Sequence, residues 1–91
     1  MNSAKQSLFP AADSFSEQGS LIDHNYTAQQ CMEFARRHGT STDETTRTLA
    51  AFALHTGFAK QERLAGRIMS ALRAESNAQA SYQALPENCR W

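Results

Sequence analysis

The chain has 91 residues, enough for one small domain, and its nine basic and nine acidic side chains give a formal net charge of zero. That balance argues against a strong non-specific binder of nucleic acid or membranes, since both need a net basic surface. The sequence contains no run of about 18 apolar residues, so it predicts no membrane span. It also lacks a basic N-terminal segment followed by an apolar run, so it predicts no export signal. We therefore expect a cytosolic protein whose two cysteines, Cys31 and Cys89, are free thiols.

The first 25 residues carry Pro10, Gly19, several serines and scattered apolar side chains without a sustained period. We expect residues 1–25 to form a flexible, poorly ordered N-terminal arm. The apolar pairs Leu8–Phe9 and Leu21–Ile22 are the places where this arm would dock.

The first helix is predicted to begin at Thr27. Thr27 and Gln30 have the spacing of a capping box, in which each side chain bonds the other residue's backbone N–H. Gly39, after two arginines and a histidine, predicts the end of the helix through a left-handed cap and through favourable charge at the C-terminus. The apolar face between these two signals consists of Ala28, Cys31, Phe34, Ala35 and His38.

The second helix is predicted to begin with a capping box of Ser41 and Glu44 and to end at Gly57. Its apolar face would hold Leu49, Phe52, Ala53 and Thr56.

The third helix is predicted from about Ala59 to about Ser76, with a weak extension to Leu85 before Pro86. A narrow basic stripe of Lys60, Arg63 and Arg67 would flank its apolar arc. That arc would consist of Leu64, Ala65, Ile68, Met69, Ala71 and Leu72.

Three helices joined by short loops predict an all-α fold, either a small three-helix bundle or an orthogonal helical array. We assign residues 1–25 to the arm, 26–85 to the helical domain and 86–91 to a C-terminal tail. A core drawn from roughly fifty residues is marginal, and a homodimer is the common remedy. The apolar residues available for such a seam are Phe58, Met69, Tyr82, Leu85 and Trp91.

Residue types suited to catalysis or metal binding are present at unsuitable spacings. The potential metal ligands His24, Cys31, His38, His55 and Cys89 include no C-x-x-C or H-x-x-x-H pair. Cys31 and His38 would lie two helical turns apart, about 10 Å along the axis, which is beyond hydrogen-bond reach. No glycine-rich phosphate loop occurs. We therefore expect a non-enzymatic protein without catalytic residues, metal or cofactor.

Residues 34–43 read Phe-Ala-Arg-Arg-His-Gly-Thr-Ser-Thr-Asp, and they resemble the first helix and turn of the helix-turn-helix in many DNA-binding regulators. Ala35 and Gly39 have the spacing of that motif's small residue and turn glycine, and Ser41 would cap its second helix. Threonines stand where the motif usually has aliphatic residues, so DNA binding is our alternative prediction. The DNA contacts that the resemblance implies are Arg36, Arg37 and Arg47.

In the arm, Gln6-Ser7-Leu8-Phe9 resembles the short motif by which bacterial replication proteins dock onto the sliding clamp. The resemblance implies a peptide that buries two apolar anchors in a groove of a protein partner. Lys5 stands where the motif prefers glutamine.

The leading prediction is a non-enzymatic interaction module that binds, and so regulates or inhibits, a larger protein partner. Such modules are typical of mobile-element accessory genes. The basic residues are seven arginines and two lysines, and the planar guanidinium favours a contact surface. The predicted partner-binding residues are Lys60, Arg63, Arg67, Leu8 and Phe9.

Overall fold

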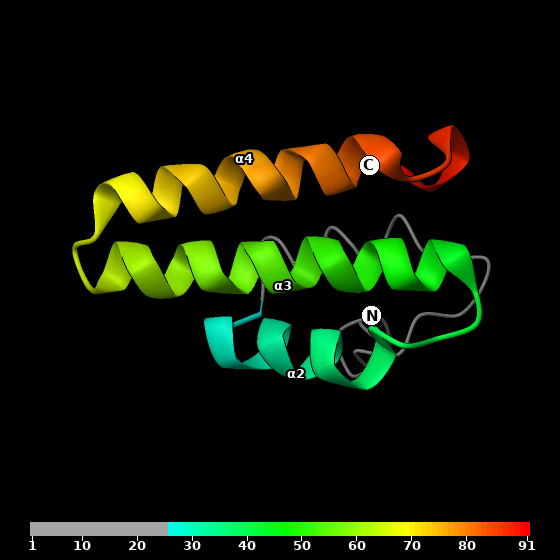
Figure 1. Cartoon of the computed structure of the whole chain (residues 1–91), viewed down its shortest axis with the longest axis horizontal. Coiled ribbons are helices and arrows are strands. Elements are labelled where there is room, and N and C mark those ends of the chain that lie inside the picture. The colour runs from blue at the N-terminus through cyan, green and yellow to red at the C-terminus, as the bar shows by residue number, and fades with distance from the viewer. Residues whose placement is uncertain (1–25) are drawn as a thin grey trace, which may run out of the picture.

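The computed structural model describes residues 26–91, which form three α-helices and one short 3-10 helix and contain no strand. The helices are α2 (Ala28–His38), α3 (Glu44–Leu64) and α4 (Ile68–Ala84), followed by η3 (Glu87–Cys89). The long α3 packs against both α2 and α4, and each of them runs in the direction opposite to α3 (Figure 1). The all-α prediction is confirmed. The predictions for residues 1–25, Leu8 and Phe9 included, lie outside the described residues.

The boundaries of α2 are those predicted. The Thr27 hydroxyl accepts a hydrogen bond from the backbone N–H of Gln30 at 3.1 Å, and the Thr27 N–H donates to the Gln30 side chain at 2.9 Å. The expected left-handed cap at Gly39 is wrong, because Gly39 has φ −66° and continues the right-handed turn. Its N–H still satisfies a terminal carbonyl, that of Ala35, at 2.8 Å.

The N-cap of α3 is Asp43, so the predicted capping box of Ser41 and Glu44 is wrong. The Asp43 carboxylate accepts hydrogen bonds from the Thr46 N–H at 2.8 Å and from the Thr46 hydroxyl at 2.6 Å. The Ser41 hydroxyl instead accepts from the Asp43 N–H at 3.1 Å. A carboxylate is the stronger acceptor and is favoured at a helix N-terminus, so Asp43 takes the capping position.

Gly57 does not end α3, contrary to the sequence prediction. The helix passes through Gly57 and continues to Leu64, and the left-handed turn falls at Gly66, with φ 81°. Gly57 is buried against α2, where an added Cβ would lie 2.9 Å from Cys31 Cβ and 3.0 Å from the Ala28 carbonyl oxygen. Its role is a close helix–helix approach.

The predicted third helix is therefore divided between the last turns of α3 and the start of α4. Leu64 and Met69, expected on a buried arc, are 87% and 74% exposed, and Ile68 and Leu72 are also exposed. The periodic pattern runs through a real turn, so its members do not share one helix face. The buried side chains of α4 are the small ones, Ala71, Ala74 and Ala78.

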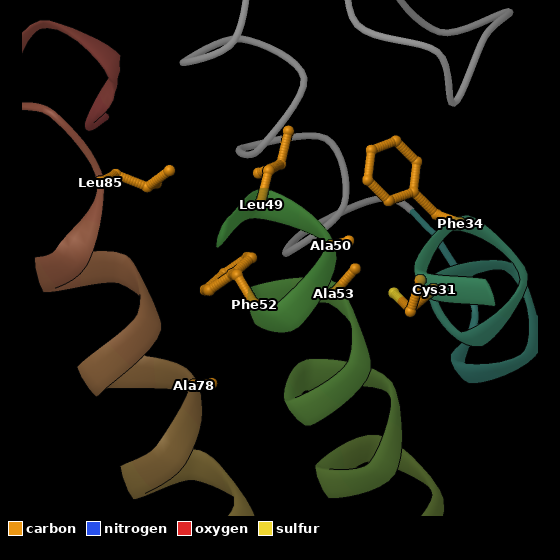
Figure 2. Close-up of a cluster of buried hydrophobic side chains, with 9 residues drawn as sticks. Cys31, Phe34, Leu49, Ala50, Phe52, Ala53, Ala78 and Leu85 are labelled. Atoms are coloured by element: carbon orange, nitrogen blue, oxygen red, sulfur yellow. The ribbon is translucent and has the colours of Figure 1, made fainter. Parts of the chain in front are cut away.

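The core joins all three helices and Leu85, the residue that follows α4 (Figure 2). Cys31 points from α2 toward Ala53, Phe52 points from α3 toward α4, and Leu85 points back toward α3. Leu85, expected at a dimer seam, is only 2% exposed and belongs to this core. Tyr26, Tyr82, Cys89 and Trp91 pack against its margin. None of the described helices is both long and apolar enough to cross a membrane.

Candidate functional site

A groove of about 480 Å³ lies between α3 and α4, and we call it the α3–α4 groove. Small buried side chains line its deepest part, namely Thr56 and Ala59 of α3 and Ala78 of α4. Because these side chains are short, the two helices leave an open channel between their larger neighbours. Aromatic rings close one end of the groove, and charged or polar side chains form its rim.

Three aromatic side chains from α3, α4 and the tail form the closed end. The Trp91 ring stands edge-on to Phe52, with centroids 5.0 Å apart, and edge-on to Tyr82, with centroids 4.8 Å apart. The Tyr82 hydroxyl donates a hydrogen bond to the backbone carbonyl of Trp91. Trp91 is thereby held over the groove by both ring packing and a hydrogen bond.

The tail is also anchored to the end of α4 by one arginine. The Arg90 guanidinium donates hydrogen bonds to the backbone carbonyls of Leu85 at 3.2 Å and Gln83 at 3.1 Å. Carbonyls at a helix C-terminus lack partners within the helix, so Arg90 satisfies groups that the end of α4 leaves open. No local pattern in residues 86–91 predicts their return onto the helices.

An ion pair links α3 to α4 at the rim of the groove. Arg63 bonds Glu75 through Nε and Nη2, the latter at 2.9 Å from Oε1, and both side chains are about half exposed. The hydrogen bond with Arg63 holds the pKa of Glu75 below its usual value. Lys60 and Gln79 complete the rim. Two of the predicted basic residues, Lys60 and Arg63, thus lie together at this groove.

Arg67 lies apart from them, in the turn before α4, where it pairs with Glu62. Its Nε and Nη2 bond the two Glu62 carboxylate oxygens at 2.7 and 2.8 Å. The Glu62 side chain is 6% exposed and the Arg67 side chain 59% exposed. Bonding to Arg67, together with a hydrogen bond from Ser70, holds the pKa of Glu62 below its usual value. This pair stabilises the turn between α3 and α4. Lys60, Arg63 and Arg67 therefore do not form the single basic stripe that was predicted.

The arginines assigned to DNA are engaged in local contacts. Arg36 and Arg37 both bond Glu33, the latter at 3.1 Å, and Arg47 donates to the Ser41 carbonyl at 2.7 Å.

The pairing of α2 with α3 also differs from a helix-turn-helix. α2 contacts α3 from the connecting loop as far as Ala28 against Gly57, which makes an antiparallel hairpin. The motif's two helices instead cross at roughly 90–120°. The arrangement does not favour the DNA-binding alternative.

Among the residues weighed as metal ligands or nucleophiles, His24 lies outside the described residues, and the others are dispersed. Within residues 26–91, no three side chains capable of binding a metal cluster together. Cys31 is buried in the core, Cys89 is half-buried near the tail, and both are free thiols. His38 packs on Phe34 with ring centroids 4.6 Å apart, and its pKa is lowered by burial and by nearby Arg37. The lowered pKa favours the uncharged form of this imidazole, which packs on Phe34.

Comparison of the chain with protein-family models, with curated proteins and with solved structures found no match. The interpretation of the α3–α4 groove therefore depends on its own geometry.

Proposed function

We propose that this chain is a protein-interaction module whose α3–α4 groove receives an apolar side chain of a larger partner, with a carboxylate beside it. Binding would regulate or inhibit that partner. The observation that carries the proposal is the groove itself, which combines a floor of small side chains, an aromatic end and a rim of four charged or polar side chains. Apolar concavities with a few placed polar groups are typical of binding sites.

The shape of the groove favours one anchoring side chain. The short floor residues Ala59 and Ala78 leave depth, and the Trp91 and Tyr82 rings offer flat apolar surface at one end. A leucine-sized or aromatic side chain would fill this space and displace water from both the floor and the rings. Aromatic anchors in desolvated pockets carry much of the binding energy at protein interfaces.

The charges of the rim favour an acidic neighbour to that anchor. Among the described residues that line the groove, the cations are Lys60 and Arg63 and the acid is Glu75. Glu75 occupies Nε and Nη2 of Arg63, so the Nη1 donors of that guanidinium stay available to a carboxylate from a partner. Such charges contribute specificity and association rate more than affinity.

Apolar side chains on α4 extend the surface beyond the groove. Ile68, Leu72, Glu75 and Gln79 are spaced four, three and four residues apart, so they lie along one side of the helix. Ile68 and Leu72 are both about half exposed. A partner anchored in the groove would cover these two residues as well, which raises the buried area toward that of a stable complex.

A random-peptide display selection on the full chain tests the proposal. Peptides that bind should share an apolar anchor beside Asp or Glu. Lys60→Glu should weaken their binding about tenfold, because it reverses the rim charge. Arg73→Glu makes the same charge change at an exposed position of α4 outside the groove, and it should retain binding. Equal losses in both variants, or selected peptides without this chemistry, would contradict the proposal.

The DNA-binding alternative makes a separate prediction. It requires salt-sensitive retention on DNA that falls when Arg36, Arg37 and Arg47 are neutralised. Unchanged mobility of DNA at low salt would remove it.

A further inference from the structure

A second groove, of about 630 Å³, lies between the start of α2 and the end of α3, and we call it the end groove. Its apolar walls include Ala28 and Met32 of α2, Leu64 of α3, and Ala65, which follows α3. Arg67 is the charged side chain among its lining residues. The end groove shares no lining residue with the α3–α4 groove.

The end groove exists because α3 is longer than the helix that covers it. Gly57 faces α2, where it meets Ala28 and Cys31. Leu64 is seven residues further on, two turns along about the same face of α3. α2 begins at Ala28, and Figure 1 shows α3 and α4 extending past that point. A core-facing position of α3 thus carries a leucine that is 87% exposed.

We propose that the end groove binds an amphipathic helix of a partner protein, with apolar residues on one face and acidic residues on its flank. The α3 surface at Leu64 continues the surface on which α2 packs, so a helix is the shape that extends the existing layer. A helix docked in an apolar groove presents anchors at positions i, i+3 or i+4, and i+7.

Charge identifies the flank of this helix as acidic. The carboxylate of Glu62 is buried behind Arg67, whereas most of the Arg67 side chain faces solvent. Glu62 occupies Nε and Nη2, so the Nη1 edge of Arg67 stays available to a partner's carboxylate.

A second copy of the chain does not fit this surface. An isologous interface would place two concave end grooves against each other, and neither could fill the other. It would also bring two Arg67 side chains to one interface, where like charges repel.

Two helical peptides of about three turns, mixed with the ¹⁵N-labelled full chain, test the proposal. One carries leucines on one face and glutamates beside them, and the other has lysines in place of the glutamates. The acidic peptide should shift the backbone amide signals of Met32, Gln61, Leu64 and Ala65 and leave those of Tyr82 and Trp91 in place. The lysine peptide should bind at least about tenfold more weakly.

Two matched variants separate this groove from general apolar exposure. Leu64→Asp should abolish the shifts and lower the melting temperature only slightly, because the side chain is exposed and a negative charge at a helix C-terminus is mildly unfavourable. Met69→Asp changes a similarly exposed residue outside the groove and should bind as the wild type does. The α3–α4 groove is intact in both variants, so the outcome is independent of the function proposed for it.

Several outcomes would overturn the proposal. These are equal binding of the two peptides, no shift with the acidic peptide, and equal losses in the Leu64→Asp and Met69→Asp variants. Binding of phosphatidylglycerol vesicles that Leu64→Asp removes would assign the surface to lipid. A concentration-dependent dimer that Leu64→Asp removes would assign it to a second copy.

Discussion

Gly57 and Cys31 set the distance between α3 and α2, because a Cβ added to Gly57 would lie only 2.9 Å from Cys31 Cβ. Two carbon atoms that are not bonded to each other cannot lie this close unless one of them shifts. The backbone carbonyl of Ala28, at 3.0 Å, blocks the same space and cannot move like a flexible side chain. The packing of α2 thus depends on the missing side chain at position 57.

Gly57→Ala should therefore lower the free energy of unfolding by about 1 kcal/mol, the overpacking cost exceeding the gain in helix propensity. Urea unfolding measures it. Ser76→Ala, at an exposed position inside α4, is the control and should be neutral or slightly stabilising. A Gly57→Ala variant as stable as the wild type would show that the helices do not approach this closely.

Tyr82→Phe removes the hydroxyl that bonds the Trp91 carbonyl and keeps the ring. We expect a loss of about 1 kcal/mol, typical of one hydrogen bond. Trp91 should also become more exposed, since its ring packing then acts without that hydrogen bond. Its emission maximum measures this directly and should move to longer wavelength. Gln83→Ala, at an exposed neighbouring position, should leave the emission unchanged.

The Glu62–Arg67 pair predicts a dependence of stability on pH. The pKa of Glu62 is lowered in the folded state, so its contribution is present above the unfolded pKa of about 4.3 and is lost as pH falls below it. The melting temperature should therefore fall on the acid side, and less steeply in Glu62→Gln. Glu33, Asp43 and Glu75 also have lowered pKa values, so some acid sensitivity should persist.

Arg67→Gln is the companion variant for that pair. It leaves the buried Glu62 carboxylate without its cation, so at neutral pH it should destabilise the protein more than Glu62→Gln does. Thermal melts of both variants between neutral and acidic pH test this order. An acid profile of Glu62→Gln identical to that of the wild type would contradict the assignment.

The two candidate caps of α3 predict different losses. Asp43→Ala should lower the melting temperature more than Ser41→Ala does, since the Asp43 carboxylate accepts both hydrogen bonds from Thr46. Circular dichroism melts compare the two variants. The opposite order would restore Ser41 as the cap.

The parts of the fold that the sequence predicts are those decided locally. Thr27 and Gln30 are three residues apart, and their capping box depends on nothing beyond them. Gly57 shows the opposite case, because its role depends on Cys31 of another helix. In the sequence, a glycine between two apolar patterns looks the same whether it ends a helix or allows another helix to pack closely. Leu64 and Ile68 keep helical spacing across the turn at Gly66, so the periodicity of the sequence does not reveal that one helix ends and another begins there.

The candidate site shows the same division. The cations Lys60 and Arg63 could be recognised from spacing alone, and they do lie at one rim. The aromatic end of the groove could not be recognised, because Phe52 and Trp91 meet only after α4 returns along α3 and the tail folds back. Arg67 is separated from the other two by a turn that periodicity does not detect.

The most direct test of the proposed function is a titration of the full chain with a selected tryptophan-free peptide, followed by the emission of Trp91, the only tryptophan. The proposed function predicts a saturable change in emission for the wild type and for Arg73→Glu, and about tenfold weaker binding for Lys60→Glu. Binding that leaves the emission of Trp91 unchanged, or that is equally strong in Lys60→Glu, would contradict it.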